Sequence, residues 1–154
     1  MPDPIALNAK SARLGLPFLY SGQSQKEVFV NEALVRLDAL LHCVVEGIEN
    51  TPPASAEDGK VWLVGPEPTG PWAGQPDRLA LQQAGGWIFL NQAEGMRVTN
   101  RLTSQDLRYV SGQWKAASPP ATPTAGTVVD TELRTSFAAL VSSLRDAGIF
   151  GQEI

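Results

Sequence analysis

Residues 16–49 read LPFLYSGQSQKEVFVNEALVRLDALLHCVVEGIE, and this stretch decides the fold. Within it, residues 24–27 (SQKE) match a capping box, in which a serine hydroxyl accepts the backbone N–H of a glutamate three residues later and the glutamate side chain reaches back. The motif predicts that a helix begins at Ser24. Because Gly, Asn and two Pro residues supply stop signals at positions 47–53, we expect one long helix over residues 24–49.

Large apolar residues of this predicted helix recur at alternating spacings of four and three, the heptad rhythm of a coiled-coil seam. They are Val30, Leu34, Leu37, Leu41, Val44 and Ile48. Ala33, Leu40 and Gly47 lie beside the seam and widen the apolar face. We therefore expect the helix to pack against more than one surface.

Composition limits the classes of function. The chain has 154 residues with 12 Pro and 14 Gly, enough for one small domain with long irregular connections. Its formal net charge is −4 and no run of Lys or Arg occurs, which argues against binding nucleic acid. The N-terminus lacks the apolar core of a signal peptide, and no stretch approaches the roughly 18 apolar residues that span a bilayer. We expect a protein made in the cytoplasm, without membrane insertion.

Chemistry-bearing residues are few. Cys43 is the one cysteine, so no internal disulfide can form, and its place in the predicted helix favours a buried thiol. His42, the one histidine, has no acid and nucleophile evident nearby and is expected at or near the surface. No phosphate or dinucleotide loop motif is present. We expect no catalytic, cofactor or metal site, and solvated surface positions for the acidic residues Asp38, Glu46, Glu49, Glu57 and Asp58.

The pattern changes after residue 58 to short β-like runs between turns. These runs cover residues 60–64, 78–83, 87–91, 96–100, 107–110 and 113–115. Gly85-Gly86 suits the positive-φ turn of a tight hairpin, and Ser111-Gly112 is a second turn signal. Because strands this short need a packing partner, we expect a small antiparallel meander over residues 50–117, covered on one face by the long helix.

The two ends of the chain differ in character. Residues 1–23 carry two early prolines and predict an extended arm. Residues 118–126 contain three prolines and predict a semi-rigid linker. Residues 127–154 predict a last helix, capped by Asp130 and ended by a left-handed Gly148. This helix carries the heptad stripe Leu133, Phe137, Leu140 and Leu144, followed by Ala147.

The fold class is therefore α+β, with an arm, a long amphipathic helix on a β meander, a linker and a C-terminal coiled-coil helix. A short isolated helix is marginal in water, and burying one Leu or Phe gains roughly 1.5–3 kcal/mol. We therefore expect a parallel homotrimer; the alternative is a last helix docked on its own domain. The predicted oligomerisation residues are Val30, Leu34, Leu37, Leu41, Leu133, Phe137, Leu140 and Leu144.

All four tryptophans fall in the β region, at positions 62, 72, 87 and 114. Tryptophan dominates small β cores, so core or interface roles are expected for each. Trp72 lies in the loop Gly70-Pro71-Trp72-Ala73-Gly74 and is the best candidate for stacking on a sugar ring.

The sequence resembles a family of domains of unknown function found in tail-fibre and head-spike proteins of alphaproteobacterial phages and gene transfer agents. The match runs over about residues 14–116. Its motifs here are LPF at 16–18, Gln23, Gln25-Lys26, NEAL at 31–34, LDAL at 37–40, PPAS at 52–55, Asp58-Gly59, GPWAG at 70–74, Gly86-Trp87 and Gly112-Gln113-Trp114. The segment from Gly126 to Ile149 is similar to a short C-terminal helix that ends many phage fibre and spike proteins.

This resemblance implies a virion protein made in the bacterial cytoplasm, without enzymatic activity. It implies a trimeric short fibre, spike or fibre base whose N-terminal arm contacts tail, baseplate or capsid proteins and which carries a distal fibre partner. Family members often continue into a large receptor-binding region, whereas this sequence ends at Ile154, which favours a base, an adaptor or a short fibre. The alternative is an adhesin module that binds a host surface glycan directly through Trp72.

Overall fold

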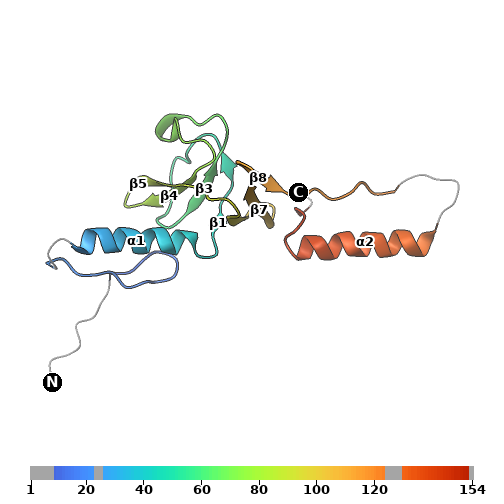
Figure 1. Ribbon diagram of the computed structural model, residues 1–154, viewed down its shortest axis with the longest axis horizontal. Coiled ribbons are helices and arrows are strands. Elements are labelled where there is room, and N and C mark those ends of the chain that lie inside the picture. Colours follow the sequence, from blue (N-terminus) through green and yellow to red (C-terminus); the bar gives the residue numbers. More distant parts are fainter. Residues whose placement is uncertain (1–8, 23–25, 124–129, 153–154) are drawn as a thin grey trace, which may run out of the picture.

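The structure is a computed structural model that describes residues 9–22, 26–123 and 130–152. The described residues form two α-helices, eight short strands and one 3-10 turn, Gly70–Trp72. Helix α1 (Lys26–Leu40) lies along one side of a β module, and helix α2 (Thr131–Asp146) projects away from the module at the other end of an elongated molecule (Figure 1). The predicted α+β class is confirmed.

The strands form two four-stranded sheets with orders β1-β6-β7-β8 and β2-β3-β4-β5. The first contains β1 (Val44–Val45), β6 (Arg97–Asn100), β7 (Gln105–Val110) and β8 (Gln113–Ala116); the second contains β2 (Ile48–Glu49), β3 (Val61–Val64), β4 (Leu79–Gln83) and β5 (Gly86–Leu90). β1 and β2 pair in parallel with their neighbours, and all other pairs are antiparallel. All six predicted runs are strands, but the simple antiparallel meander is wrong.

The long predicted helix is also wrong in its second half. Helix α1 ends at Leu40, and the next residues turn through His42, which has a φ of 48°, into β1 and β2. The backbone of this segment bonds to both sheets: Cys43 O accepts Thr99 N–H at 2.9 Å, and Gly47 O accepts Leu63 N–H at 3.0 Å. Pairing with two sheets therefore overrides the helical periodicity. The predicted cap Ser24 lies outside the described residues.

Helix α1 packs on the module through a different face from the one predicted. Its buried residues are Val35, Asp38 and Ala39, whereas Leu37 is exposed. Val35 and Ala39 lie four residues apart on one side of the helix and join a core that both sheets supply. That core contains Val35, Ala39, Cys43, Val45, Val61, Leu63, Leu79, Leu81, Leu90, Val98 and Leu107. The expected burial of Cys43 is confirmed, although in a turn before a strand and not in a helix.

The described part of the N-terminal arm is a hairpin fastened to α1, which corrects the extended arm predicted there. Phe18 N–H donates to Ala9 O at 2.9 Å, and Phe18 packs against the core. The Asp38 carboxylate accepts the backbone N–H groups of Arg13 at 2.9 Å and Leu14 at 2.7 Å. Asp38 is therefore a buried acceptor and not the solvated acid that we expected.

The Arg13 guanidinium, in turn, bonds to the backbone at the end of α1. It donates to the carbonyl oxygens of Asp38 at 2.6 Å, Ala39 at 3.0 Å and His42 at 3.0 Å. The last carbonyls of a helix have no intrahelical partner, and a cation is favoured there by the helix dipole. Arg13 and Asp38 thus form a reciprocal clamp between the hairpin and α1.

The C-terminal helix has the ends that the sequence predicts. The Asp130 side chain accepts Leu133 N–H at 2.8 Å at the start. At the end, Gly148 has a φ of 73°, and Ile149 N–H donates to Leu144 O at 2.9 Å, the pattern of a Schellman cap. The described part of the linker runs outward beside α2, so that α2 leads the chain back to the β module (Figure 1).

Asp38→Ala should lower the free energy of unfolding by roughly 1.5–3 kcal/mol, because two N–H groups lose a charged, buried acceptor. Urea denaturation of both proteins measures the difference. Glu32→Ala is the control: Glu32 only pairs with Arg36 in an exposed i,i+4 contact, so it should cost about 0.5 kcal/mol or less. Equal costs for the two variants would show that the clamp does not stabilise the fold.

Candidate assembly surface

An uncovered apolar stripe runs along the outer side of α1. Val30 is 41% exposed, Leu37 is 50% exposed, and Leu41, directly after the helix, is 46% exposed. Leu34 is half-buried. The α1 stripe therefore consists of the four residues predicted for oligomerisation, and the chain's own β module leaves it largely open.

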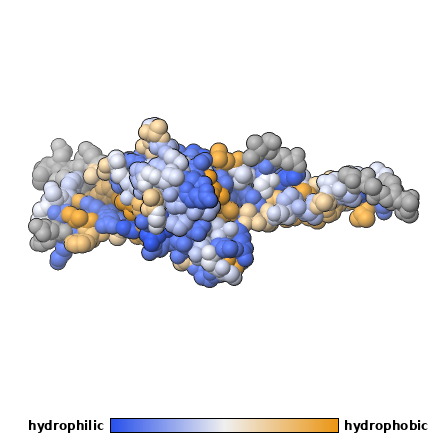
Figure 2. Space-filling model, turned by 90° about the horizontal axis from the view of Figure 1, so that it is seen from above, coloured by the Kyte–Doolittle hydropathy of each residue, from blue (hydrophilic) through white to orange (hydrophobic). Residues whose placement is uncertain are grey.

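Two apolar neighbours, Val28 and Phe29, extend the exposed surface at the start of α1, at 63% and 76% exposure. They fall outside the heptad spacing, so apolar periodicity does not predict their part in this surface. Figure 2 shows hydrophobic groups gathered at the end of the molecule where α1 begins, while the middle of this view is mostly hydrophilic. Exposed apolar surface that clusters in this way is typical of an interaction site.

A second uncovered stripe lies on α2, where no residue is buried. Leu133 is 66% exposed and Leu140 is 56% exposed, whereas Phe137 and Leu144 are half-buried. Near its start the helix contacts the linker: Arg134 donates to Pro123 O at 3.1 Å. A mostly apolar hollow of about 330 Å³ lies there, lined by Pro123, Asp130, Leu133, Arg134 and Phe137.

The structure does not bring the two stripes together within one chain. Helices α1 and α2 lie at opposite ends of the molecule, with the β module between them (Figure 1). Each helix has about four turns, and no residue of α2 is buried by the described part of the chain. Because burial of each Leu or Phe gains roughly 1.5–3 kcal/mol, each stripe is suited to contact another molecule.

Trp72 is not a surface platform. Its side chain is fully buried with Val64 and Ala80, and Trp62 and Trp87 pack against that cluster. The Trp72 and Trp87 rings meet edge to face with centroids 5.0 Å apart. The ring anchors the loop before β4 and presents no face to a sugar, so the predicted glycan contact at Trp72 is wrong for this conformation.

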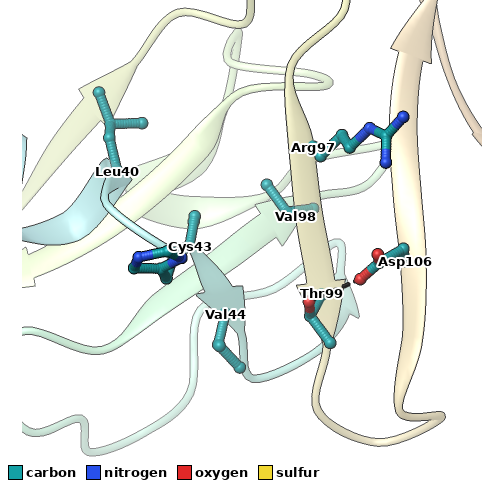
Figure 3. A pocket seen from close by; sticks show the side chains of 8 residues that line it. Leu40, Cys43, Val44, Arg97, Val98, Thr99 and Asp106 are labelled. Atoms are coloured by element: carbon teal, nitrogen blue, oxygen red, sulfur yellow. Dashed lines mark hydrogen bonds between the residues drawn. The ribbon is translucent and has the colours of Figure 1, made fainter. Parts of the chain in front are cut away.

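A hollow of about 370 Å³ lies where α1 meets the first sheet (Figure 3). It is lined by Leu40, His42, Cys43, Val44, Arg97, Val98, Thr99 and Asp106. Burial raises the pKa of the Cys43 thiol to about 11, against the opposing effect of the Arg13 charge. A protonated thiol is a poor nucleophile and metal ligand. In residues 9–22, 26–123 and 130–152, no group of three or more His, Cys, Asp or Glu side chains could hold a metal ion.

Comparisons with known proteins give one family. A family model described as "Protein of unknown function (DUF2793)" matches residues 30–115. The matched region contains most of α1 and nearly all of both sheets, and it ends before α2. A search of curated proteins finds no match. None of the helices in the described part of the chain has the length and apolar character needed to cross a membrane.

Cys43 should react with a thiol reagent such as DTNB only when the protein unfolds. Because burial raises the folded pKa from 9.0 to about 11, the folded thiol stays protonated where an unfolded thiol ionises. This contribution to stability is complete below pH 9 and is lost as the pH rises toward 11. The free energy of unfolding of the wild type should therefore fall more steeply over that range than that of Cys43→Ala. Parallel curves would contradict the prediction.

Proposed function

This chain belongs to the DUF2793 family of proteins of unknown function, and we propose that it is a non-enzymatic structural component of a phage or phage-like particle. In this proposal the protein is a trimeric short fibre, spike or fibre base. It anchors to the particle through its N-terminal region and contacts a distal partner. The observation that carries the proposal is the pair of uncovered apolar stripes on α1 and α2.

The sequence motifs support the virion context. The family match to residues 30–115 includes the NEAL and LDAL motifs of α1 and the GPWAG loop, which carry the resemblance to fibre and spike proteins. The segment that resembles the C-terminal helix of such proteins begins at Gly126, and its described part contains α2. Two resemblances in separate parts of the chain thus favour the same context.

The arrangement of the stripes supports a trimer as the assembly. Leu, Phe and Val at heptad spacing along one side of a helix suit a coiled-coil seam, and three copies around an axis would bury both stripes. Since α2 projects beyond the β module at the end opposite α1, three α2 helices would extend the end of the fibre that lies away from the particle (Figure 1). The adhesin alternative depended on Trp72, which is buried, so no observation favours it.

Phe137→Asp and Leu37→Asp test the two stripes separately. Light scattering after size-exclusion chromatography should give a trimer mass for the wild type at micromolar concentration. Each carboxylate would lie in the proposed seam, where desolvation and like-charge repulsion oppose assembly. Both variants should therefore lose trimer mass while the circular dichroism of the β module is retained.

Leu102→Asp is the matched control, because Leu102 is 65% exposed in the turn after β6 and belongs to neither stripe. It should remain trimeric. A monomeric wild type, or stripe variants that assemble like Leu102→Asp, would overturn the proposed trimer.

An antibody against the protein should also label purified particles of a phage or gene transfer agent that encodes it. Particles without label would overturn the virion role.

A further inference from the structure

Three basic side chains lie side by side across the outer face of the first sheet. Arg97 in β6 is the register partner of Arg108 in β7, and Arg108 is the register partner of Lys115 in β8. All three are exposed, while Val98 and Leu107, which follow or precede them in their strands, are buried in the core. Because side chains alternate between the two faces of a strand, the three cations share the outer face. We call them the basic row.

The basic row carries an energetic cost that the chain relieves only in part. Like charges directly opposite each other destabilise a sheet, and adjacent strands lie only about 4.8 Å apart. Among the described residues, none of the three cations takes part in an ion pair or side-chain hydrogen bond. Asp106 lies on the same face and offsets one of the three positive charges, although its carboxylate bonds to the Thr99 hydroxyl at 2.7 Å and to none of the cations (Figure 3).

Protection of a sheet edge explains the presence of only one of the three cations. Lysine on an edge strand discourages unwanted strand pairing, and Lys115 lies in β8, an edge strand of this sheet. Arg97 and Arg108 lie in β6 and β7, which have neighbours on both sides. Two arginines facing each other in the interior of a sheet therefore need another reason, and a charge pattern kept at the expense of stability is typical of a functional surface.

Small hollows lie on both sides of the basic row. One, of about 180 Å³, is lined by the three cations together with Asp106, Leu107, Ala117 and Ile149. The other is the hollow of Figure 3, where Leu40 and Val44 lie near Arg97. The face thus combines a short line of positive charge with two shallow recesses, of which the one that includes Ile149 is mostly apolar. It is positive although the whole chain has a net charge of −4.

We propose that this face is a docking surface for an acidic segment of another protein, whose Asp or Glu carboxylates pair with the basic row. The guanidinium group of arginine binds carboxylates through two parallel hydrogen bonds, and the mostly apolar hollow can receive apolar side chains beside the acids. This inference is independent of the proposed particle role. It concerns a surface that neither apolar stripe includes.

The aromatic residues of the same strands favour a protein partner over a sugar or nucleic acid. Sugar rings and unpaired bases are usually held by aromatic stacking. Tyr109 and Trp114 face the other side of the sheet, where their rings lie 5.2 Å apart and the Trp114 indole donates to Asp77 O at 2.9 Å. The net negative charge of the chain also opposes the approach of a long polyanion.

Fluorescence anisotropy of a labelled peptide of alternating Glu and Thr tests the proposal at low ionic strength. The wild type should bind this peptide and not the matching Gln and Thr peptide, and added salt should weaken binding. The variant R97Q/R108Q/K115Q should bind at least about tenfold more weakly, since it loses three charge-assisted contacts. The control K10Q/R36Q/R101Q removes the same charge at exposed or half-buried sites away from the basic row and should bind like the wild type.

Thermal unfolding separates lost binding from misfolding. Because the repulsion across β6, β7 and β8 disappears, the basic-row variant should melt at the same temperature as the wild type or higher. Equal binding by the two triple variants would overturn the proposal. Failure of the wild type to bind the acidic peptide would also overturn it, whether or not the protein binds polygalacturonate or single-stranded DNA.

Discussion

The structure depends on a single segment, residues 43–50, that belongs to both sheets. The carbonyl groups of Cys43 and Val45 accept N–H groups from β6 and the residue after it, and those of Gly47 and Glu49 accept from β3 and the residue after it. Only Glu46 lies between Val45 and Gly47, and its own N–H donates to Val61 O at 2.7 Å. Neither sheet can therefore shift against the other without breaking main-chain hydrogen bonds, and Val45, fully buried, fixes the point at which the segment passes between them.

This constraint explains why α1 is short and how it is oriented. The chain must be extended by residue 44, so the helix ends in a turn at His42 without the glycine or proline that usually marks such an end. Arg13 supplies the missing partners for the last carbonyls, and Asp38 holds the hairpin that carries Arg13. The buried face of α1 is thereby directed at the core, and the heptad stripe is left on the outside.

Local signals in the sequence predicted local structure well, and signals that depend on distant residues did not. Asp130 and Gly148 mark both ends of α2 because a cap needs only its own neighbours. The hairpin turn was displaced by one residue, since Ala84 joins Gly85 at positive φ. The heptad spacing of apolar residues continues past Leu40 although the helix does not. The residues that end the helical pattern lie in β3 and β6, which are distant in the sequence. The basic row could not be predicted for the same reason. Its three residues become neighbours only through the pairing register of β6, β7 and β8.

The linker and α2 together form an appendage whose two ends meet at the β module. Phe150 pairs with Ala117 in a parallel bridge, and the Gln105 side chain donates to Ala117 O at 2.5 Å and to Ile149 O at 2.9 Å. Asp106 N–H also donates to Gly148 O at 2.7 Å and Gln152 N–H to Thr103 O at 2.9 Å, so all of these contacts lie close to the point where the linker departs. Evolution can lengthen, shorten or exchange such an appendage without refitting the module, and the family match indeed stops at residue 115, just before the appendage begins.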